Sequence, residues 1–320
     1  MILNIEKSLY QKALELIENS RYILLITHVN PDADSIGGAL ALSNFFIENR
    51  IKHKVFNVGK NIPRNVEFLN GFNKITDILP PFFDLAISVD CGAYSRLGIK
   101  LDENIPLINF DHHASNENFG TINLVDAKMA STSEIIFDFF KYNDLKISKN
   151  SAEALYTGIY SDTQALSLPR TTKETFSKMS HLLDCGVNSS YIAENFLRKD
   201  SLAKYRILPK ILDSLELHKE GKVASIYAKN EWFKSTGAKS IDCEEALDMI
   251  LRIGVVKIAF FIRELDKSCR ISLRSKENID VSKIAKIFNG GGHINAAGCT
   301  IYDKDLEEVK SLVLKEIYEI

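Results

Sequence analysis

The stretch Pro106-Leu107-Ile108-Asn109-Phe110-Asp111-His112-His113 decides how the rest of the chain is interpreted. It begins as a short apolar run and ends in an acid and two imidazoles. Such a pattern is typical of a buried strand that delivers polar side chains to a site at its end. The chain therefore contains at least one strand whose carboxyl end carries groups suited to metal binding or catalysis.

Two earlier apolar runs, 23–27 and 85–89, end in the same way. The polar residues that follow them are His28, Asp32, Asp34 and Asp90. Helical segments separate the runs, and strands that alternate with helices predict a parallel sheet of βαβ units. In an open α/β sheet the site lies beyond the carboxyl ends of the strands. The three runs therefore predict one site at one edge of one sheet.

The composition is that of an ordinary globular chain. Its 320 residues allow two domains with separate cores, and 45% of them are hydrophobic. The 40 basic and 42 acidic side chains give a net charge of −2, which argues against a protein that coats duplex nucleic acid. The same balance allows a small anionic ligand that is held at a local positive site.

The cysteine pattern and the apolar runs predict a cytoplasmic protein. The five cysteines form no C-x-x-C pair, so we expect neither disulfides nor structural zinc. The first residues lack the apolar core of a signal peptide. Because every apolar run is shorter than the roughly 20 residues of a membrane span, we expect no membrane partner.

The first part of the chain alternates between predicted helices and strands. We expect one helix over residues 4–19 and another from about 35 to 49, with Asp34 or Ser35 as its N-cap. Residues 131–134, Ser-Thr-Ser-Glu, form a capping-box pattern for a further helix.

The pattern changes in the last third of the chain. Residues 187–216 are predicted to be a helical connector, and strand-like alternation follows. Within it, Arg270 and Arg274 share the polar face of a half-buried strand. We therefore predict an α/β protein with three parts: a parallel-sheet catalytic domain at 1–186, the connector at 187–216, and a smaller mixed-sheet α/β domain at 217–320.

The strand-end residues combine histidine nitrogen with carboxylate oxygen, a ligand set that suits Mn²⁺, Fe²⁺ or Zn²⁺, and the excess of oxygen favours Mn²⁺. Each cluster alone also fits a structural role, since Asp32 and Asp34 are common in turns and caps and Asp90 could cap the next segment. Together the three strand ends favour a metal site. One ring of the His112-His113 pair would bind metal, the other would contact substrate, and Asp111 would orient a ring.

A glycine run in the second domain offers a site for an anion. Gly290-Gly291-Gly292-His293 could supply backbone N–H groups that hold a phosphate, with His293 as a further donor. Arg270 and Arg274 precede it, and a planar guanidinium group donates two hydrogen bonds to phosphate. The alternative is that the glycines only turn the chain and that Arg274 pairs with a surface acid.

Five segments together resemble the motifs of the DHH phosphoesterases. The first four are His28-x-x-Pro31-Asp32-x-Asp34-Ser35-x-Gly37, Val89-Asp90, Asp111-His112-His113 and Ser161-Asp162-Thr163. The fifth, Gly290-Gly291-Gly292-His293-x-x-Ala296-Ala297-Gly298, looks like the DHH-associated C-terminal domain. They span nearly the whole chain in the family's order. The compact length resembles the NrnA-like branch, which contains nano-RNases and pAp phosphatases.

The resemblance implies two bound Mn²⁺ ions, for which Mg²⁺ or another divalent ion could substitute. The implied ligands are His28, Asp32 and Asp90 for one ion, and Asp34, Asp90, His112 and Asp162 for the other. A water activated by both metals would attack phosphorus, and His113 would contact the scissile phosphate or the leaving oxygen. The C-terminal domain would hold the far end of the nucleotide through His293, the glycine run and Arg274.

Two departures from the family pattern stand out. Ala33 lies where a glycine is frequent, and residues 164–170 replace a glycine followed by an aromatic residue. Ala33 should be tolerated if its φ is negative. The change at residues 164–170 alters a loop that contacts substrate in relatives.

We predict a phosphoesterase that hydrolyses short single-stranded RNA or DNA, with pAp as a second substrate. The nearest alternative is a cyclic di-AMP or pApA phosphodiesterase with the same chemistry and a different pocket. An alternative of another class is a nucleotide-binding regulator that lacks catalysis. The presence of all six implied metal ligands argues against this alternative. A homodimer is one assembly that this prediction leaves open.

Overall fold

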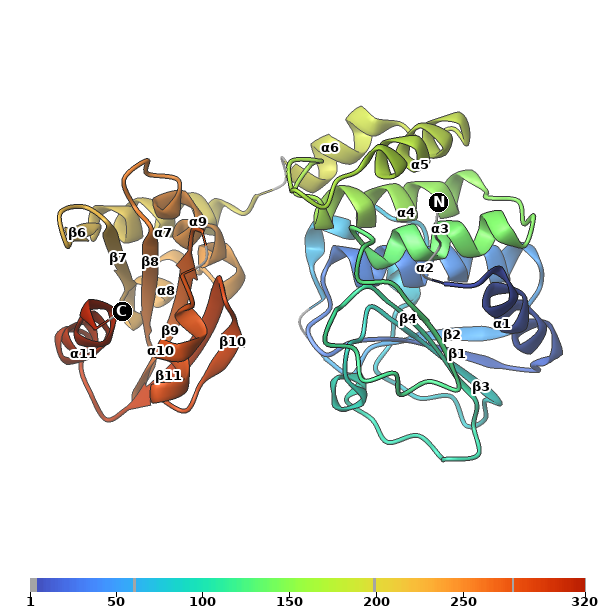
Figure 1. The fold of residues 1–320 in the computed structure, drawn as a ribbon, viewed down its shortest axis with the longest axis horizontal. Coiled ribbons are helices and arrows are strands. Elements are labelled where there is room, and N and C mark those ends of the chain that lie inside the picture. The colour runs from blue at the N-terminus through green and yellow to red at the C-terminus, as the bar shows by residue number, and fades with distance from the viewer. Residues whose placement is uncertain (1–4, 60–61, 198–199, 278, 320) are drawn as a thin grey trace. The chain divides into compact units, whose positions relative to one another are not determined.

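The computed structural model describes residues 5–59, 62–197, 200–277 and 279–319. The chain forms two compact units, Met1–Lys199 and Asp200–Ile320, each built on its own sheet (Figure 1). The predicted fold class, a parallel sheet followed by a mixed sheet, is confirmed. The division at residues 186 and 216 stays a prediction, and each unit contains one helix of the predicted connector.

Parallel strands build the sheet of the first unit. In spatial order they are β2 (His53–Phe56), β1 (Ile23–Thr27), β3 (Leu85–Val89), β4 (Leu107–Asp111) and β5 (Ile122–Val125). The register pairs Leu25 with Ile87 and Ile87 with Ile108, so that apolar rows run across the sheet. Because all five strands run the same way, their carboxyl ends lie at one edge.

Helices cover one face of this sheet. Those that contact its strands are α1 (Lys7–Asn19), α2 (Ala33–Glu48) and α3 (Thr132–Tyr142). Outside them lie α4 (Lys149–Asp162), α5 (Lys173–Asp184) and α6 (Ser189–Leu197), as Figure 1 shows. Strand residues such as Leu25 and Ile87 point into the core with the helices, whereas Leu24 and Ile26 face a smaller core of loop residues. Short 3₁₀ helices lie at Arg64–Val66, Phe72–Lys74 and Tyr94–Leu97.

The second unit has a six-stranded sheet with helices on both faces. In spatial order its strands are β10 (Gly291–His293), β11 (Ala296–Tyr302), β9 (Ser268–Ser275), β8 (Ile258–Glu264), β7 (Val223–Ala228) and β6 (Glu216–His218). β7 and β8 are parallel, and the other neighbours are antiparallel. One core contains α7 (Leu202–Asp213), α8 (Asn230–Thr236), the 3₁₀ helix Ser240–Cys243 and α9 (Glu244–Leu251), and the other contains α10 (Val281–Ile287) and α11 (Leu306–Tyr318).

Three local details differ from the sequence-based expectations. The N-cap of α2 is Asp32, because its carboxylate accepts the Ser35 N–H at 3.0 Å and the helix begins earlier than predicted. The strand β5 was not predicted, since its four residues form a strand only by pairing with β4. The glycine run is an edge strand rather than a loop, because Gly291 pairs with Gly298 of β11.

Candidate metal centre

The carboxyl ends of three adjacent parallel strands carry most of the predicted ligands. β1 leads to His28 and to the start of α2, where Asp32 is the N-cap and Asp34 lies in the first turn. β3 leads to Asp90, and β4 leads to His112. These residues are distant in sequence, and the parallel sheet places them at one edge.

The side chains form groups in which the ligand atoms lie within 4.8 Å of one another. The groups are His28–Asp32–Asp90, Asp34–His112–Asp162 and Asp90–His112–His113. His28 Nε2 is 3.5 Å from Asp90 Oδ2. His112 Nε2 is 3.1 Å from Asp162 Oδ2, at the end of α4, and 3.7 Å from Asp90 Oδ1. The six residues expected to bind metal therefore meet, and Asp90 lies beside both sets.

Asp90 is the electrostatic centre of this cluster, and it is only 1% exposed. Burial alone would raise its pKa, but the hydrogen bond with His28 and the nearby His112 and His113 lower the pKa of Asp90 to about 2. Its φ is +61°, in the left-handed region that Asp and Asn adopt more readily than most residues. The three histidines thus favour the ionised form of Asp90.

The other carboxylates lie close to like charges. Burial, Asp162 and Asp90 raise the pKa of Asp34 well above its ordinary value. Burial among the same neighbours raises the pKa of Asp32 to about 6, although half of its side chain is exposed. Burial opposes protonation of His112, but its hydrogen bond to Asp162 and the nearby carboxylates raise the pKa of His112 to about 10. Divalent cations fit this donor set, because they can replace the protons that offset the negative charge.

His113 has a different environment from His112. The two rings are inclined by 62°, and the side chain of His113 is 31% exposed. Its Nδ1 lies 2.7 Å from Asp111 Oδ1, and this hydrogen bond raises the pKa of His113. The Asn116 amide donates to the other oxygen of Asp111 at 2.5 Å. The ring that Asp111 orients is therefore that of His113.

Four polar residues around the cluster were missed by the sequence reasoning. Arg96 Nη2 lies 2.8 Å from His28 Nδ1, and Asn116 holds Asp111. Thr132 and Ser133, at the start of α3, contact the aspartates of the cluster. The available signals were weak. Arg96 lies in a short 3₁₀ helix after β3 and Asn116 in the loop after β4, and the other two residues belong to a pattern that was interpreted only as a helix cap.

In the second unit, Arg270 and Arg274 lie on β9, as predicted from its alternation. The exposed Arg270 donates from Nη1 to Thr300 Oγ1 at 3.2 Å. Arg274 is partly exposed, and its Nε lies 3.9 Å from Asp248 Oδ1. Weak surface pairing of this kind leaves both guanidinium groups able to bind an anion.

The glycine run lies beside β11. Gly290 and Gly292 have no room for a Cβ, which would overlap the backbone of β11. The backbone of His293 pairs with Ala296, and Ala296 pairs in turn with Arg274. The side chain of His293 lies outside what the structure describes. The register nevertheless brings position 293 and Arg274 into one row of the sheet.

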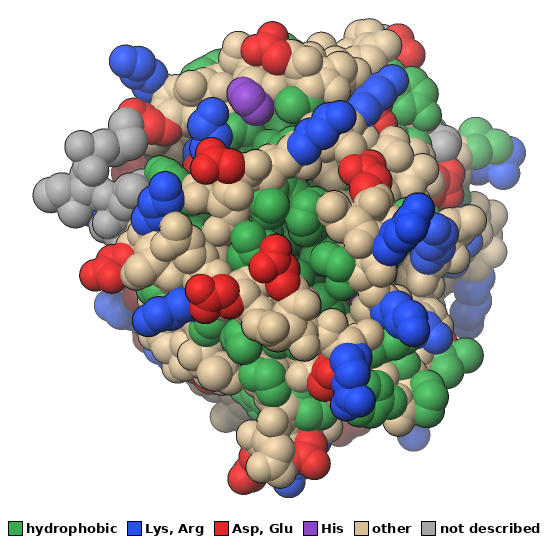
Figure 2. All heavy atoms as spheres, turned by 90° about the vertical axis from the view of Figure 1, so that its right-hand side faces the viewer, with side chains coloured by type: hydrophobic (Ala, Val, Ile, Leu, Met, Phe, Trp, Pro, Cys, Tyr) green, Lys and Arg blue, Asp and Glu red, His purple; other side chains and the backbone are tan. Residues whose placement is uncertain are grey.

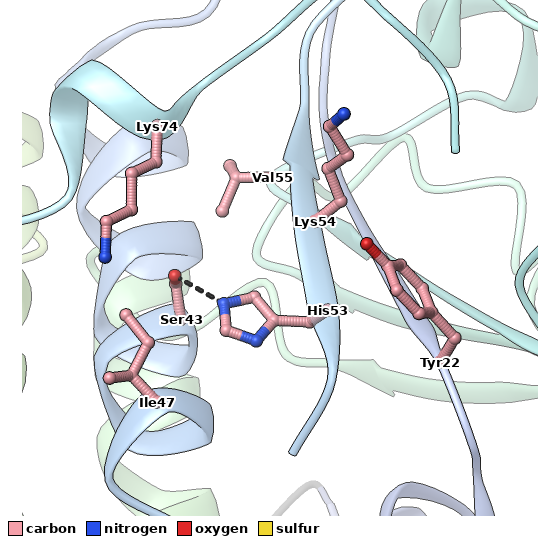
Figure 3. A pocket seen from close by; sticks show the side chains of 7 residues that line it. All are labelled: Tyr22, Ser43, Ile47, His53, Lys54, Val55 and Lys74. Carbon is pink, nitrogen blue, oxygen red and sulfur yellow. Dashed lines mark hydrogen bonds between the residues drawn. The ribbon is translucent and has the colours of Figure 1, made fainter. Parts of the chain in front are cut away.

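A hollow of about 320 Å³ lies near the amino ends of the strands of the first sheet (Figure 3). The residues that line it are Tyr22, Ser43, Ile47, His53, Lys54, Val55 and Lys74. The His53 ring is engaged on both nitrogens, by Ser43 Oγ at 2.7 Å and by the Ile51 carbonyl at 2.9 Å. None of these lining residues is acidic, so the carboxylate cluster at the opposite edge remains the candidate site.

The chain is similar to proteins of known families along most of its length. Residues 22–159 match the DHH family, N-terminal domain, and residues 219–319 match the DHHA1 domain. A relative from Streptococcus mutans, named probable bifunctional oligoribonuclease and PAP phosphatase NrnA, is 30% identical over 91% of this chain and 94% of its own length. The cyclic-di-AMP phosphodiesterase PdeA of Listeria monocytogenes is 28% identical over 96% of this chain, which spans 49% of that protein.

A solved structure shares the fold of both units. The exopolyphosphatase-related protein from Bacteroides fragilis superposes with a TM-score of 0.88 and 26% identity, over 98% of each chain. Among the described residues, no helix has the length and apolar character needed to cross a membrane.

Proposed function

The chain belongs to the DHH family, and from this membership we propose that it is a metal-dependent phosphoesterase that hydrolyses short oligonucleotides and converts pAp to AMP. The observation that carries the proposal is the cluster at the carboxyl edge of the first sheet, where six ligand-type side chains meet. Hydrolysis of a phosphate ester needs an activated water and positive charge at the phosphoryl oxygens, and a pair of bound divalent ions supplies both.

Two Mn²⁺ ions are the proposed occupants, with Mg²⁺ as a substitute. The proposed ligands are His28, Asp32 and Asp90 for one ion, and Asp34, Asp90, His112 and Asp162 for the other. The oxygen-rich donor set supports this assignment. So does the charge on Asp90, which three histidines keep ionised.

His113 is proposed to act on the substrate. Its Nδ1 is engaged by Asp111, which fixes the ring and raises the pKa of His113. A protonated His113 can then donate from Nε2 to a phosphoryl or leaving oxygen. Asn116 limits the motion of Asp111 and so of the ring.

The proposed substrate class rests on the relatives and is consistent with the charges on one face. The Streptococcus mutans relative is named for oligoribonuclease and PAP phosphatase activities. Proteins that track long single strands use continuous cationic grooves with stacking residues. On the face drawn in Figure 2, the described acidic and basic side chains are interspersed. In the second unit, Arg274, Arg270, His293 and the glycine run Gly290-Gly291-Gly292 are proposed to bind the nucleotide.

The second candidate is a phosphodiesterase for cyclic di-AMP or pApA, and the similarity to PdeA favours it. A regulator without catalysis is less well supported, because all six ligand-type residues are present and clustered. We further propose a cytoplasmic location, which the five free thiols support.

A substrate panel under Mn²⁺ tests the proposal. The panel contains pAp, a dinucleotide, cyclic di-AMP and a 24-nucleotide strand, with the Asp90→Asn protein as the background control. We expect the dinucleotide and pAp to be hydrolysed fastest. Faster hydrolysis of cyclic di-AMP would favour the second candidate, and no hydrolysis of any of them would favour the regulator.

A further inference from the structure

The first turn of α3 donates hydrogen bonds to two aspartates of the cluster. The Thr132 N–H lies 2.6 Å from Asp34 Oδ2, and the Ser133 N–H and hydroxyl lie 3.0 and 2.5 Å from Asp34 Oδ1. The Thr132 hydroxyl lies 2.8 Å from Asp90 Oδ1. Thr132 is thus bonded to one aspartate of the second ligand set and to the aspartate shared by both sets.

We propose that Thr132 and Ser133 are positioning residues, which fix the carboxylates of Asp34 and Asp90 for metal binding. The inference rests on the metal-binding role proposed above. Each carboxylate oxygen has two lone-pair directions. A donor on one direction restricts rotation of the carboxylate. Ser133 occupies both directions of Asp34 Oδ1, so the direction left for a cation lies on Asp34 Oδ2, and Asp90 Oδ1 keeps one beside the Thr132 hydroxyl. Residues that orient metal ligands in this way typically change metal affinity by about 10- to 100-fold when they are mutated.

The location of these donors at a helix start supports the same role. The first N–H groups of a helix lack partners inside the helix and carry partial positive charge. Here two of them point at Asp34, which is completely buried and close to other acids. They hold the Asp34 carboxylate in one orientation, through geometry that the bare sequence does not contain.

Close packing of α4 keeps this arrangement in place. A Cβ at Gly158 would overlap Ser133 Oγ and would lie 2.7 Å from Asp34 Oδ1. The glycine therefore lets α4 approach the point where Ser133 meets Asp34. No larger side chain fits there without moving one of the two.

A simple capping role does not account for these contacts. The N-cap of α3 is Ser131, whose hydroxyl accepts the Glu134 N–H at 3.2 Å. The Thr132 and Ser133 hydroxyl groups point to aspartates 42 and 99 residues away in sequence. Their contribution can therefore be separated from the stability of the helix.

The test measures Mn²⁺ binding by titration calorimetry and the melting temperature of the metal-free protein. The variants are Thr132→Val and Ser133→Ala. The matched control is Thr157→Val, which removes a buried hydroxyl that donates to the Glu153 carbonyl within α4. We expect Thr132→Val to weaken Mn²⁺ binding about 10- to 100-fold, with a metal-free melting temperature close to that of the control. Thr132→Ser, which restores the hydroxyl, should recover most of the affinity.

The possible outcomes separate the two proposals. A wild-type protein that binds no Mn²⁺ overturns the metal site itself. Normal wild-type binding with unchanged affinity in both Thr132→Val and Ser133→Ala overturns only the positioning role. An equal loss of affinity in Thr157→Val also overturns it, because the effect would then be one of general stability. If Thr132→Val does not fold, Ser133→Ala provides the same measurement independently.

Discussion

Replacing Asp90 by Asn is the sharpest test of the metal centre. The substitution keeps the shape of the side chain and an oxygen that can accept the Thr132 hydroxyl, and it replaces the charged carboxylate by a neutral amide. Asn also tolerates the left-handed φ of +61° at this position, whereas Ala would add strain on the order of 1–2 kcal/mol. A loss of activity in the Asn protein can therefore be attributed to the missing carboxylate.

The structure sets the expected magnitude. The shift of the Asp90 pKa from 3.8 to about 2 corresponds to roughly 2–3 kcal/mol in favour of the ionised form. Asn cannot supply this interaction to the three histidines, and its NH2 group replaces one of the two oxygens that Asp90 offers to the ligand sets. Metal catalysis contributes several kcal/mol to such a transition state, so kcat on a dinucleotide should fall by on the order of 10³-fold or more.

The assay combines Mn²⁺ titration calorimetry with initial rates on a dinucleotide. Asp144→Asn is the matched control, because Asp144 also has a left-handed φ, of 53°, and is an exposed residue outside the cluster. We expect the control to behave as wild type. The reasoning is refuted if the Asp90→Asn protein binds two Mn²⁺ ions with wild-type affinity and retains its rate within tenfold.

Three further predictions follow from the same structure. Mn²⁺ affinity should increase between pH 6 and pH 9, because the raised pKa values of His112 and Asp34 mean that bound protons must leave before metal binds. Calorimetry in two buffers should detect the release of these protons, and a pH-independent affinity would contradict this prediction. Substrates of about two to five nucleotides should be hydrolysed faster than a 24-nucleotide strand, since an extended cationic track is not expected; equal rates would count against this selection. Arg274→Ala should lower kcat/KM on a dinucleotide roughly ten- to a hundredfold and leave the rate of bis-p-nitrophenyl phosphate hydrolysis unchanged. Replacement of the exposed Arg252 by Ala is the control. Equal losses of activity on both substrates would indicate a folding defect.

The sequence by itself determined the parallel sheet and the edge at which the candidate site lies. Apolar runs such as Leu107–Phe110 predict buried strands because burial on both faces removes the alternation of polar residues. An acid or imidazole at the end of each run then marks the carboxyl edge. The alternation of Arg270 and Arg274 likewise required only the two-residue period of a strand.

Only the tertiary structure decided which of these groups support one another. Asp34 and Thr132 are 98 residues apart, and His28 and Arg96 are 68 apart, so no local pattern joins them. The short strands β5 and β10 exist because neighbouring strands offer them hydrogen bonds, a non-local effect that outweighs weak intrinsic propensity. The raised pKa values of His112 and Asp34 have the same origin, because they depend on burial and on charges that the fold brings together.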